Sequence, residues 1–327
     1  MNPILDDRKL ESQEMRAAYI NTLIEMAERD SRVLTLDADL RMALTLDFAK
    51  KFPSRAIECG IQEANMIGVA AGLSATGMVP FAQSFTPFVI RRAYETICVS
   101  AAYGKLNVKL MGFDQGVLAA YNGGTHMSFD DIGLIRMIPD TMVFDIADST
   151  MLKDILWQIK DIYGVQYVRF PRDQMKRLYK KETRFEIGKG LVIHDGTDAT
   201  IITSGIQVDE ALNAAEALNK IGISVRIVDM FTIKPLDTAL VQTCAEQTGA
   251  IVTAENHGIV GGLGSAVAET LLESAPVPME RVGVQNEFGE VGSVDYLMNR
   301  FCLDAPHIVE AVKKVVAKKH NYNPVRR

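Results

Sequence analysis

Short apolar runs and longer amphipathic stretches alternate along the first half of the chain. The short runs predict strands, and they lie at 33–36, 56–59, 79–81, 108–111, 142–146 and 166–169. Apolar residues at helical spacing predict helices, and these lie at 11–27, 45–51, 62–75, 88–102, 132–137 and 150–159. Strands that alternate with helices at this spacing indicate a parallel sheet with helices on both faces. In such sheets, ligands bind at the carboxyl ends of the strands.

The second half repeats this alternation after a change in composition. Strands are predicted at 200–203, 224–229, 250–253 and 280–284, and helices at 208–220, 236–246, 263–272 and 305–318. Residues 173–187, between the two halves, are dense in charge and lack an apolar period, which is typical of an interdomain connection. We therefore expect an α/β protein with two doubly wound domains and mainly parallel sheets, at 10–172 and 188–327, joined by the charged linker.

Length and composition narrow the class of protein. The chain has 327 residues, which exceeds the usual size of one domain and favours two. The net charge of −6 argues against nucleic acid as a partner, since phosphate binding needs a basic face. The four cysteines lie far apart in no metal-binding pattern, so we expect reduced thiols and no metal site in this chain. No apolar run approaches membrane-spanning length and the acidic start lacks a signal sequence, so we expect a cytoplasmic protein without membrane contact.

The helix predicted at 62–75 combines one carboxylate with many small residues. Glu63 lies in its first turn, where the helix dipole favours a carboxylate, so a capping role is one interpretation. One face of this helix carries only small residues, which are Ala64, Gly68, Gly72 and Ala75. Such a face lets another backbone approach closely, which suggests a tight helix contact, including one across a subunit boundary.

Two phenylalanines and two arginines follow the strand predicted at 79–81. Phe85 and Phe88 are typical of ordinary core packing, which is the alternative to a role in a binding site. Arg91 and Arg92 lie three and four positions beyond Phe88. A helix would therefore place an aromatic ring and an arginine on one face.

The segment 113–126 has no hydrophobic periodicity and contains three glycines, so we predict a loop. His126, the one histidine of the first domain, lies in it, and a loop histidine is a good candidate for acid–base chemistry. Other polar candidates, most of them at strand ends or in loops, are Arg16, Asp39, Asp114, Asn122, Arg169 and Arg172. The glycine run 261–264 before a helix resembles a phosphate cradle, but close helix packing is the preferred interpretation.

Several short motifs occur in a specific order along the chain. A glycine is followed by Glu63-Ala64-Asn65-Met66, and then by GVAAGL, PFAQSFTPF, GGTH and VRFPR. Each motif alone is weak evidence, but their order and spacing make the sequence similar to the C-terminal half of the transketolase family. The resemblance covers the pyrimidine-binding and C-terminal domains, as in split two-subunit transketolases. It extends over nearly the whole chain from about Arg16.

The resemblance implies thiamine diphosphate as the cofactor. Glu63 corresponds to the glutamate that hydrogen-bonds N1′ of the aminopyrimidine ring, and a desolvated carboxylate there acts as a general acid–base. Phe85 and Phe88 correspond to aromatic positions that pack on this ring. Arg91 stands at a third cofactor-binding position, which is tyrosine in many transketolases and arginine in deoxyxylulose-phosphate synthases. Asp39 corresponds to an acid near the cofactor that helps to link the subunits.

Substrate contacts follow from the same resemblance. Arg16 and Arg169 correspond to arginines that hold the phosphate end of the sugar, and His126 to a histidine that contacts hydroxyls of donor and acceptor. Many transketolases have a histidine near Asp114 and an aspartate where Asn122 stands, and both touch hydroxyls of the sugar. Because of these departures, a branched or sulfonated sugar is the alternative to a common pentose phosphate as the substrate.

One part of the family pattern is missing from this sequence. Full-length members carry an N-terminal domain with Gly-Asp-Gly and a later Asn, which binds Mg²⁺ and the diphosphate. Asp195-Gly196 lies in the second domain without that pattern. We therefore expect one subunit of a split enzyme, in a heterotetramer with a separate diphosphate-binding subunit that supplies the Mg²⁺ ligands. The small-residue face of the Glu63 helix is where we expect this partner to dock.

The expected function is ketol transfer, in which a two-carbon unit moves from a ketose phosphate or similar anionic sugar to an aldose while His126 helps to move hydroxyl protons. One alternative is the β subunit of a 2-oxo acid dehydrogenase, which shares the domain order and also lacks the diphosphate domain. A deoxyxylulose-phosphate-synthase-like enzyme is a related alternative. An alternative of another class is a non-catalytic binding subunit, against which the presence of Glu63 argues.

Overall fold

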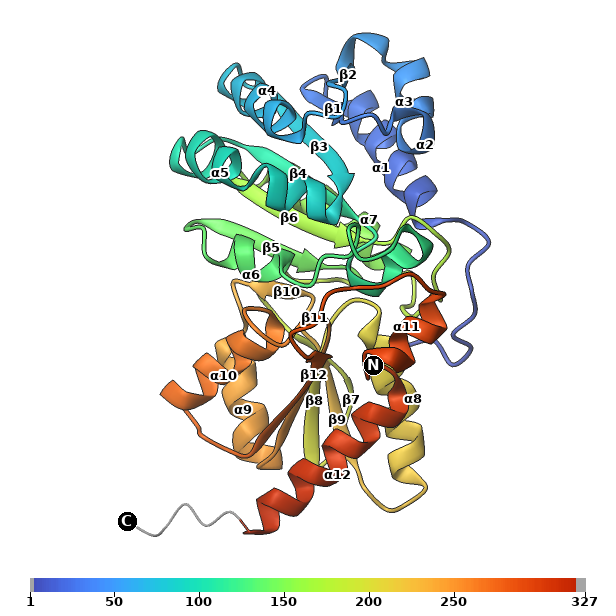
Figure 1. Ribbon diagram of the computed structural model, residues 1–327, viewed down its shortest axis with the longest axis vertical. Helices are drawn as coiled ribbons and strands as arrows, with labels where there is room; N and C mark the ends of the chain where they lie inside the picture. Colours follow the sequence, from blue (N-terminus) through green and yellow to red (C-terminus); the bar gives the residue numbers. More distant parts are fainter. Residues whose placement is uncertain (1–2, 322–327) are drawn as a thin grey trace.

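A computed structural model describes residues 3–321, which form two α/β units that lie one above the other along the long axis (Figure 1). The sheet of the first unit has seven strands in the order β10-β5-β6-β4-β3-β1-β2. Six of them come from the first half of the chain: β1 (Val33–Asp37), β2 (Ala56–Glu58), β3 (Val79–Phe85), β4 (Val108–Phe113), β5 (Thr141–Asp145) and β6 (Val165–Phe170). These six strands are parallel to one another, as the alternating pattern predicted.

Helices cover both faces of this sheet because each face buries its own apolar layer. On one face, α1 (Met15–Arg29) and α7 (Ser149–Asp161) pack together with the short helices α2 (Arg41–Leu44), α3 (Leu46–Lys51) and η1 (Pro53–Arg55) near them. On the other face lie α4 (Glu63–Ala75), η2 (Phe88–Arg92), α5 (Tyr94–Thr96), η3 (Ile97–Tyr103) and α6 (Asp131–Arg136). Both apolar layers continue into the second unit, so the two units share their core.

The second sheet has five strands in the order β12-β11-β8-β9-β7. Its strands are β7 (Leu191–His194), β8 (Ala199–Thr203), β9 (Val225–Asp229), β11 (Ile251–Gly258) and β12 (Met279–Val284). The helices are α8 (Gln207–Asn219), α9 (Thr238–Thr248), α10 (Leu263–Glu273), α11 (Val294–Arg300) and α12 (Ala305–Asn321). The α/β class with mainly parallel sheets is confirmed, with two antiparallel strands that the pattern did not predict. One of these is β7, which pairs with β9.

The other antiparallel strand, β10 (Thr232–Lys234), crosses between the units. It follows β9 in the chain but pairs with β5, at the edge of the first sheet. The N–H of Asp145 also donates to the carbonyl of Phe231 at 3.0 Å. Only one of its three residues, Ile233, is apolar, so β10 forms no apolar run that pattern analysis could find.

The charged segment 173–187, predicted as a linker between the domains, is packed against the body of the protein. Leu178, Tyr179 and Phe185 are buried, and the rings of Tyr179, Phe185 and Phe231 pack in edge-on contacts. The segment also forms antiparallel bridges with the N-terminal stretch, from Tyr179 to Ile4 and from Lys176 to Leu10. Its apolar side chains are inserted from irregular backbone, which explains why they show no period.

Two further segments depart from the predicted elements. The helix predicted at 88–102 contains two π-helical stretches, η2 and η3, on either side of the short α5. The loop predicted at 113–126 contains the 3₁₀ stretch η4 (Gly116–Asn122), which is interrupted at Ala120 by a φ of 44° and a ψ of −116°. Both departures lie next to the candidate site.

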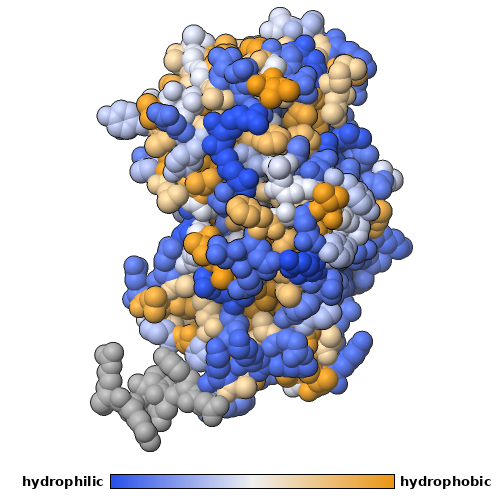
Figure 2. All heavy atoms as spheres, in the orientation of Figure 1, coloured by the Kyte–Doolittle hydropathy of each residue, from blue (hydrophilic) through white to orange (hydrophobic). Residues whose placement is uncertain are grey.

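The surface of the described part is mixed in polarity. On the face shown in Figure 2, hydrophobic residues are scattered among hydrophilic ones. Within residues 3–321, no helix combines the length and apolar character that crossing a membrane requires.

Candidate active site

The candidate site lies where three neighbouring parallel strands of the first sheet end. Phe85 is the last residue of β3 and is paired in register with Phe113, the last residue of β4. Phe113 is paired with Phe170, the last residue of β6. The residues that follow, Asp114 and Arg172, therefore come together beside Phe85 at one edge of the sheet.

Glu63 begins α4 and is almost completely buried, with 2% of its surface exposed. Its Oε2 accepts a hydrogen bond from Nη1 of Arg92 at 2.6 Å, and its Oε1 accepts one from the Ser84 hydroxyl at 3.4 Å. A buried carboxylate is costly without a charged or hydrogen-bonding partner, and the start of α4 adds the favourable end of the helix dipole. The side chain of Glu63 is thus held by partners on β3 and η2.

Three rings form a half-buried aromatic patch next to this carboxylate. Phe85 and Phe88 meet edge to face, with ring centroids 6.1 Å apart. The ring of His126 contacts both, at 5.5 Å from Phe85 and 4.9 Å from Phe88. The Thr125 hydroxyl lies 3.0 Å from Nδ1 of His126. The two phenylalanines are not fully packed core residues, which was the alternative interpretation of their sequence.

An arginine lies over each phenylalanine. The guanidinium of Arg92 is 4.6 Å from the centroid of Phe88, and that of Arg172 is 4.7 Å from the centroid of Phe85. The sequence hypothesis placed Arg91 at the cofactor, but the structure pairs Arg91 with Asp130 at 2.8 Å and with the carbonyl of Met127 at 3.1 Å. In the π-helical turn, the arginine four residues after Phe88 is the one that reaches Glu63.

Asp114 and Arg172 form a tight ion pair at the edge of the patch. Asp114 has a left-handed φ of 54° and is 4% exposed, and its two oxygens accept from the backbone N–H of Arg172 at 2.9 Å and from its Nε at 2.6 Å. Burial raises the pKa of Asp114, and Arg172 opposes this effect. Arg172 keeps part of its side chain exposed, so it can offer donors to a ligand.

Arg16 lies beside this pair at the start of α1. Its backbone N–H donates to the carbonyl of Arg172 at 3.0 Å. Its side chain donates to Glu14 at 2.6 Å and to the carbonyl of Ala43 at 3.3 Å. The hydrogen bond to Glu14 raises the pKa of Arg16, with smaller contributions from acids that include Asp114. The Arg16 guanidinium borders a surface depression of about 210 Å³.

Asp39 and Asn122 occupy exposed positions in turns. Asp39 follows β1 with a φ of 60°, and its N–H donates to the Glu58 carboxylate at 2.7 Å. Asn122 ends η4, directly before Gly123 with its φ of 79°. Neither side chain belongs to the group formed by Glu63 and the aromatic rings.

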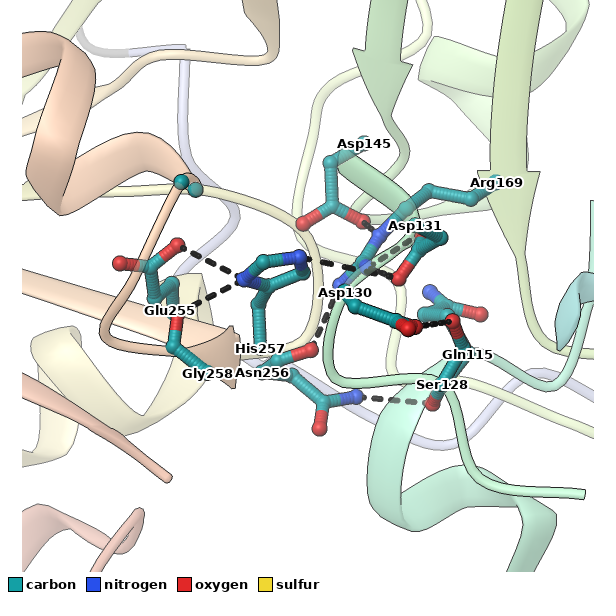
Figure 3. A network of polar contacts seen from close by, with 12 residues as sticks. Gln115, Ser128, Asp130, Asp131, Asp145, Arg169, Glu255, Asn256, His257 and Gly258 are labelled. Carbon is teal, nitrogen blue, oxygen red and sulfur yellow. Dashed lines mark hydrogen bonds and ion pairs between the residues drawn. The ribbon is translucent and has the colours of Figure 1, made fainter. Parts of the chain in front are cut away.

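Arg169 is placed differently from the sequence hypothesis. Its side chain is completely buried between the two units (Figure 3), where Nε donates to Asp145 at 3.0 Å, Nη1 to Asp131 at 2.9 Å and Nη2 to the carbonyl of Asn256 at 2.8 Å. Burial opposes its charge, but Asp131 and Asp145 outweigh this effect and raise its pKa. This placement does not support a role for Arg169 in holding substrate, because its donors are directed at protein groups.

Two functional candidates had a weak signal or none in the sequence. Ser84, which donates to Glu63, precedes the end of a strand and has no motif of its own. Asp37 is buried in β1, where it accepts from Thr45 at 2.6 Å and from Gln83 at 3.0 Å, and burial raises its pKa to about 6. Gln83 in turn accepts from the hydroxyl of Tyr19. A hydrogen-bonded chain of this kind could be found only once the strands were placed.

The glycine run before α10 is filled by the protein itself. Glu255 directs its carboxylate at the start of this helix and accepts from the N–H groups of Leu263 at 2.7 Å and Gly264 at 2.9 Å. A Cβ at Gly262 would overlap this carboxylate. Close packing is therefore the reason for these glycines, and a phosphate has no free place there. Within residues 3–321, no three or more His, Cys, Asp or Glu side chains are grouped so as to hold a metal ion.

Comparison with known proteins divides the chain into the same two parts. Residues 11–177 match the family model of the transketolase pyrimidine binding domain, and residues 188–308 match that of the transketolase C-terminal domain. Together these models cover most of the sequence.

Individual relatives match over nearly their full length. The 6-deoxy-6-sulfo-D-fructose transketolase subunit of Clostridium sp. (strain MSTE9) is 45% identical over 95% of this chain and 97% of its own. An apulose-4-phosphate transketolase subunit of Phocaeicola vulgatus is 34% identical over 93% of this chain and 97% of its own. A solved structure described as a split gene transketolase, inactive beta4 tetramer, is 41% identical with a TM-score of 0.87, and the match covers 94% of this chain and 99% of that one.

Proposed function

Because this chain belongs to the transketolase family, as a subunit of a split transketolase, we propose that it transfers a two-carbon ketol unit from an anionic ketose to an aldose. The observation that carries this proposal is the grouping of the buried Glu63 carboxylate, two half-buried phenylalanines and His126 at one edge of the sheet. A non-catalytic binding subunit would have no need for a buried carboxylate that opens onto a patch of rings.

The family implies thiamine diphosphate, and the residues of this site fit its aminopyrimidine ring. The Arg92 guanidinium is a flat cation that lies on the face of Phe88 and donates to Glu63. A flat group with N–H donors that took the place of this guanidinium would therefore meet the same ring and the same carboxylate. When bound, thiamine diphosphate would supply the carbanion chemistry of ketol transfer. Glu63 would hold a proton at the pyrimidine nitrogen, and Phe85 and Phe88 would pack on the ring.

On the substrate side, we assign proton movement to His126 and anion binding to arginines. His126 borders both phenylalanines, so it faces the same space as Glu63. Arg172 lies over Phe85 and pairs with Asp114, and its backbone carbonyl accepts a hydrogen bond from the N–H of Arg16. A guanidinium suits a phosphate or sulfonate end of a sugar. The relative that acts on 6-deoxy-6-sulfo-D-fructose supports a sulfonated ketose as one candidate substrate.

The partner in this proposal is a separate diphosphate-binding subunit, which supplies the Mg²⁺ ligands and forms a heterotetramer with this chain. The exposed side of α4 supports it as the contact surface, since a Cβ at Gly72 would meet no atom within 4 Å and one at Gly68 would meet only Thr96. The structural relative whose description reads inactive beta4 tetramer supports a need for a second kind of subunit.

Reconstitution with the subunit encoded next to this chain tests the proposal. Ketol transfer from a sulfonated and a phosphorylated ketose is measured with thiamine diphosphate and Mg²⁺, together with oxidative decarboxylation of pyruvate as the activity of the 2-oxo acid dehydrogenase alternative. We expect ketol transfer by the pair and none by either subunit alone. Turnover that is unchanged by Glu63→Ala, or decarboxylation without ketol transfer, would refute the proposed function.

A further inference from the structure

The loop that carries Asp114, Asn122 and His126 is held from the second unit. Asn256, in β11, is 1% exposed and directs its side chain at this loop. Its Oδ1 accepts from the N–H of Val117 at 3.0 Å, and its Nδ2 donates to the carbonyl of Gln115 at 2.9 Å (Figure 3 shows Asn256 beside Gln115). One amide side chain thus fixes the backbone on both sides of Gly116.

The loop backbone around Gly116 adopts unusual dihedral angles. Gly116 has a left-handed φ of 54°, and a Cβ there would overlap the Asn256 amide, so only glycine fits. Asp114 and Ala120 also have positive φ values, of 54° and 44°. Such conformations are costly for residues with a side chain, and they persist when surrounding structure holds them.

A second contact holds the other end of the same loop. A Cβ at Gly124 would overlap the carbonyl of Gly289, and one at Gly123 would lie 2.8 Å from Val291. The stretch between β12 and α11 is therefore packed directly against the turn that precedes His126. The second unit contacts the loop at its start and at its end.

Asn256 is itself immobilised. Its carbonyl accepts from Nη2 of Arg169 at 2.8 Å, and Arg169 is fixed by Asp131 and Asp145. The side chain that holds the loop thus rests on a buried ion network that joins the two units.

We propose that Asn256 is a positioning residue that sets the geometry of the loop containing Asp114, Asn122 and His126 for ketol transfer. This gives the C-terminal unit a part in the reaction through the loop, and it rests on the proposed function of the site. Loss of both side-chain hydrogen bonds would let the loop leave its strained backbone conformation without unfolding the sheet.

Amide hydrogen exchange in the isolated subunit tests the positioning itself. We expect Asn256→Ala to raise the exchange rate of residues 115–124 about tenfold, because two hydrogen bonds of ordinary strength are lost. Asn256→Asp has the same shape but places an oxygen against the Gln115 carbonyl, so it is expected to raise exchange in the same segment. Thr203→Val is the matched control, since Thr203 donates to the Ala254 carbonyl from the neighbouring strand without touching the loop.

Kinetic measurements on the reconstituted complex test whether Asn256 contributes to ketol transfer. We expect Asn256→Ala and Asn256→Asp to lower kcat about tenfold, with half-saturation by thiamine diphosphate within about twofold of the parent, while Thr203→Val keeps the parent kcat. Equal exchange of residues 115–124 in Asn256→Ala and Thr203→Val would overturn the inference. Faster exchange with unchanged kcat, in a complex that Glu63→Ala inactivates, would also overturn it while leaving the proposed function intact. A reconstituted complex whose kcat is unchanged by Glu63→Ala would instead refute the proposed function.

Discussion

Two arginine–carboxylate groups of the first unit, Arg169 with its two aspartates and Arg92 with Glu63, differ in what surrounds the arginine. Arg169 and its partners Asp131 and Asp145 are completely buried, and each guanidinium nitrogen donates to a protein group. Glu63 is equally buried, but its arginine, Arg92, is nearly half exposed and lies on the open face of Phe88.

The difference shows how one fold uses the same pair of charges in two ways. A network in which each donor has a fixed acceptor holds two units together, and it offers nothing to a ligand. A buried carboxylate whose partner is an exposed arginine places a strong acceptor beside an aromatic surface. Exposure of the arginine, and not burial of the acid, therefore separates the site from the structural network.

The largest effect is expected when Glu63, the acid of the Glu63–Arg92 pair, is changed. Glu63→Gln keeps the shape and removes the charge, and we expect kcat of the reconstituted complex to fall by about 10²–10⁴-fold, the range for loss of an acid–base group. Glu95→Gln, on the same face of the sheet but outside the group of rings around Glu63, is the control and is expected to keep activity. A fall of less than about tenfold in Glu63→Gln would remove the distinction between the two groups.

Disrupting the network of Arg169, Asp131 and Asp145 is expected to reduce the stability of the fold. Arg169→Met leaves Asp131 and Asp145 buried without their cation, and we expect a loss of about 3–5 kcal/mol in the free energy of unfolding. Urea denaturation of the isolated subunit measures it. A loss below about 1 kcal/mol would show that the network is not what holds the units together.

Another buried acid, Asp37, accepts hydrogen bonds from the neutral side chains of Thr45 and Gln83, and it extends the comparison to the effect of pH. Its pKa is raised to about 6 by burial, so the folded state binds its proton more tightly than the unfolded chain does. The stability that this group contributes is present below about pH 4 and is lost as pH rises through about 6. Each unit of pKa shift corresponds to about 1.4 kcal/mol, so the loss is roughly 2–3 kcal/mol.

Asp37→Asn removes this titration while keeping partners for Thr45 and Gln83. We expect the variant to gain stability relative to the parent between about pH 4 and about pH 7, measured by urea unfolding at both values. If the free energy of unfolding depended on pH in the same way in both proteins, ionisation of the buried Asp37 would not reduce the stability of the parent.

The smallest effect is expected at the exposed pair. Arg91 and Asp130 are both well exposed, and such surface pairs contribute about 0–1 kcal/mol. We expect Arg91→Ala to change the free energy of unfolding by less than about 1 kcal/mol in urea denaturation at moderate salt. A larger loss would place Arg91 with the buried arginines.

The periodicity of the sequence predicted most of the architecture because each buried strand and amphipathic helix leaves a local pattern. The predicted helix at 62–75 corresponds to α4 from Glu63 to Ala75, and the parallel order of the strands follows from their alternation with helices. The antiparallel strands β7 and β10 and the packing of segment 173–187 were not predicted, because these segments are short or irregular and leave no extended local pattern.

The site was predictable as far as local spacing determines it. Glu63, Phe85, Phe88 and His126 come together as the hypothesis requires for one site, although their roles stay a prediction. Arg169 and Arg172 could not be distinguished from the sequence. Arg169 lies inside β6, so its side chain points into the packing between units, whereas Arg172 lies beyond the strand end, where the sheet edge opens.

The first sheet depends on the second half of the chain to cover one of its edges, because β10 pairs with β5. Without it, β5 would present a row of unpaired N–H and C=O groups along its free edge, and such edges recruit strands from other molecules. A fragment that ends at residue 172 would carry this edge uncovered. We expect such a fragment to aggregate even where each of its own elements can form, because the segment that caps its sheet is encoded far downstream, at Thr232–Lys234.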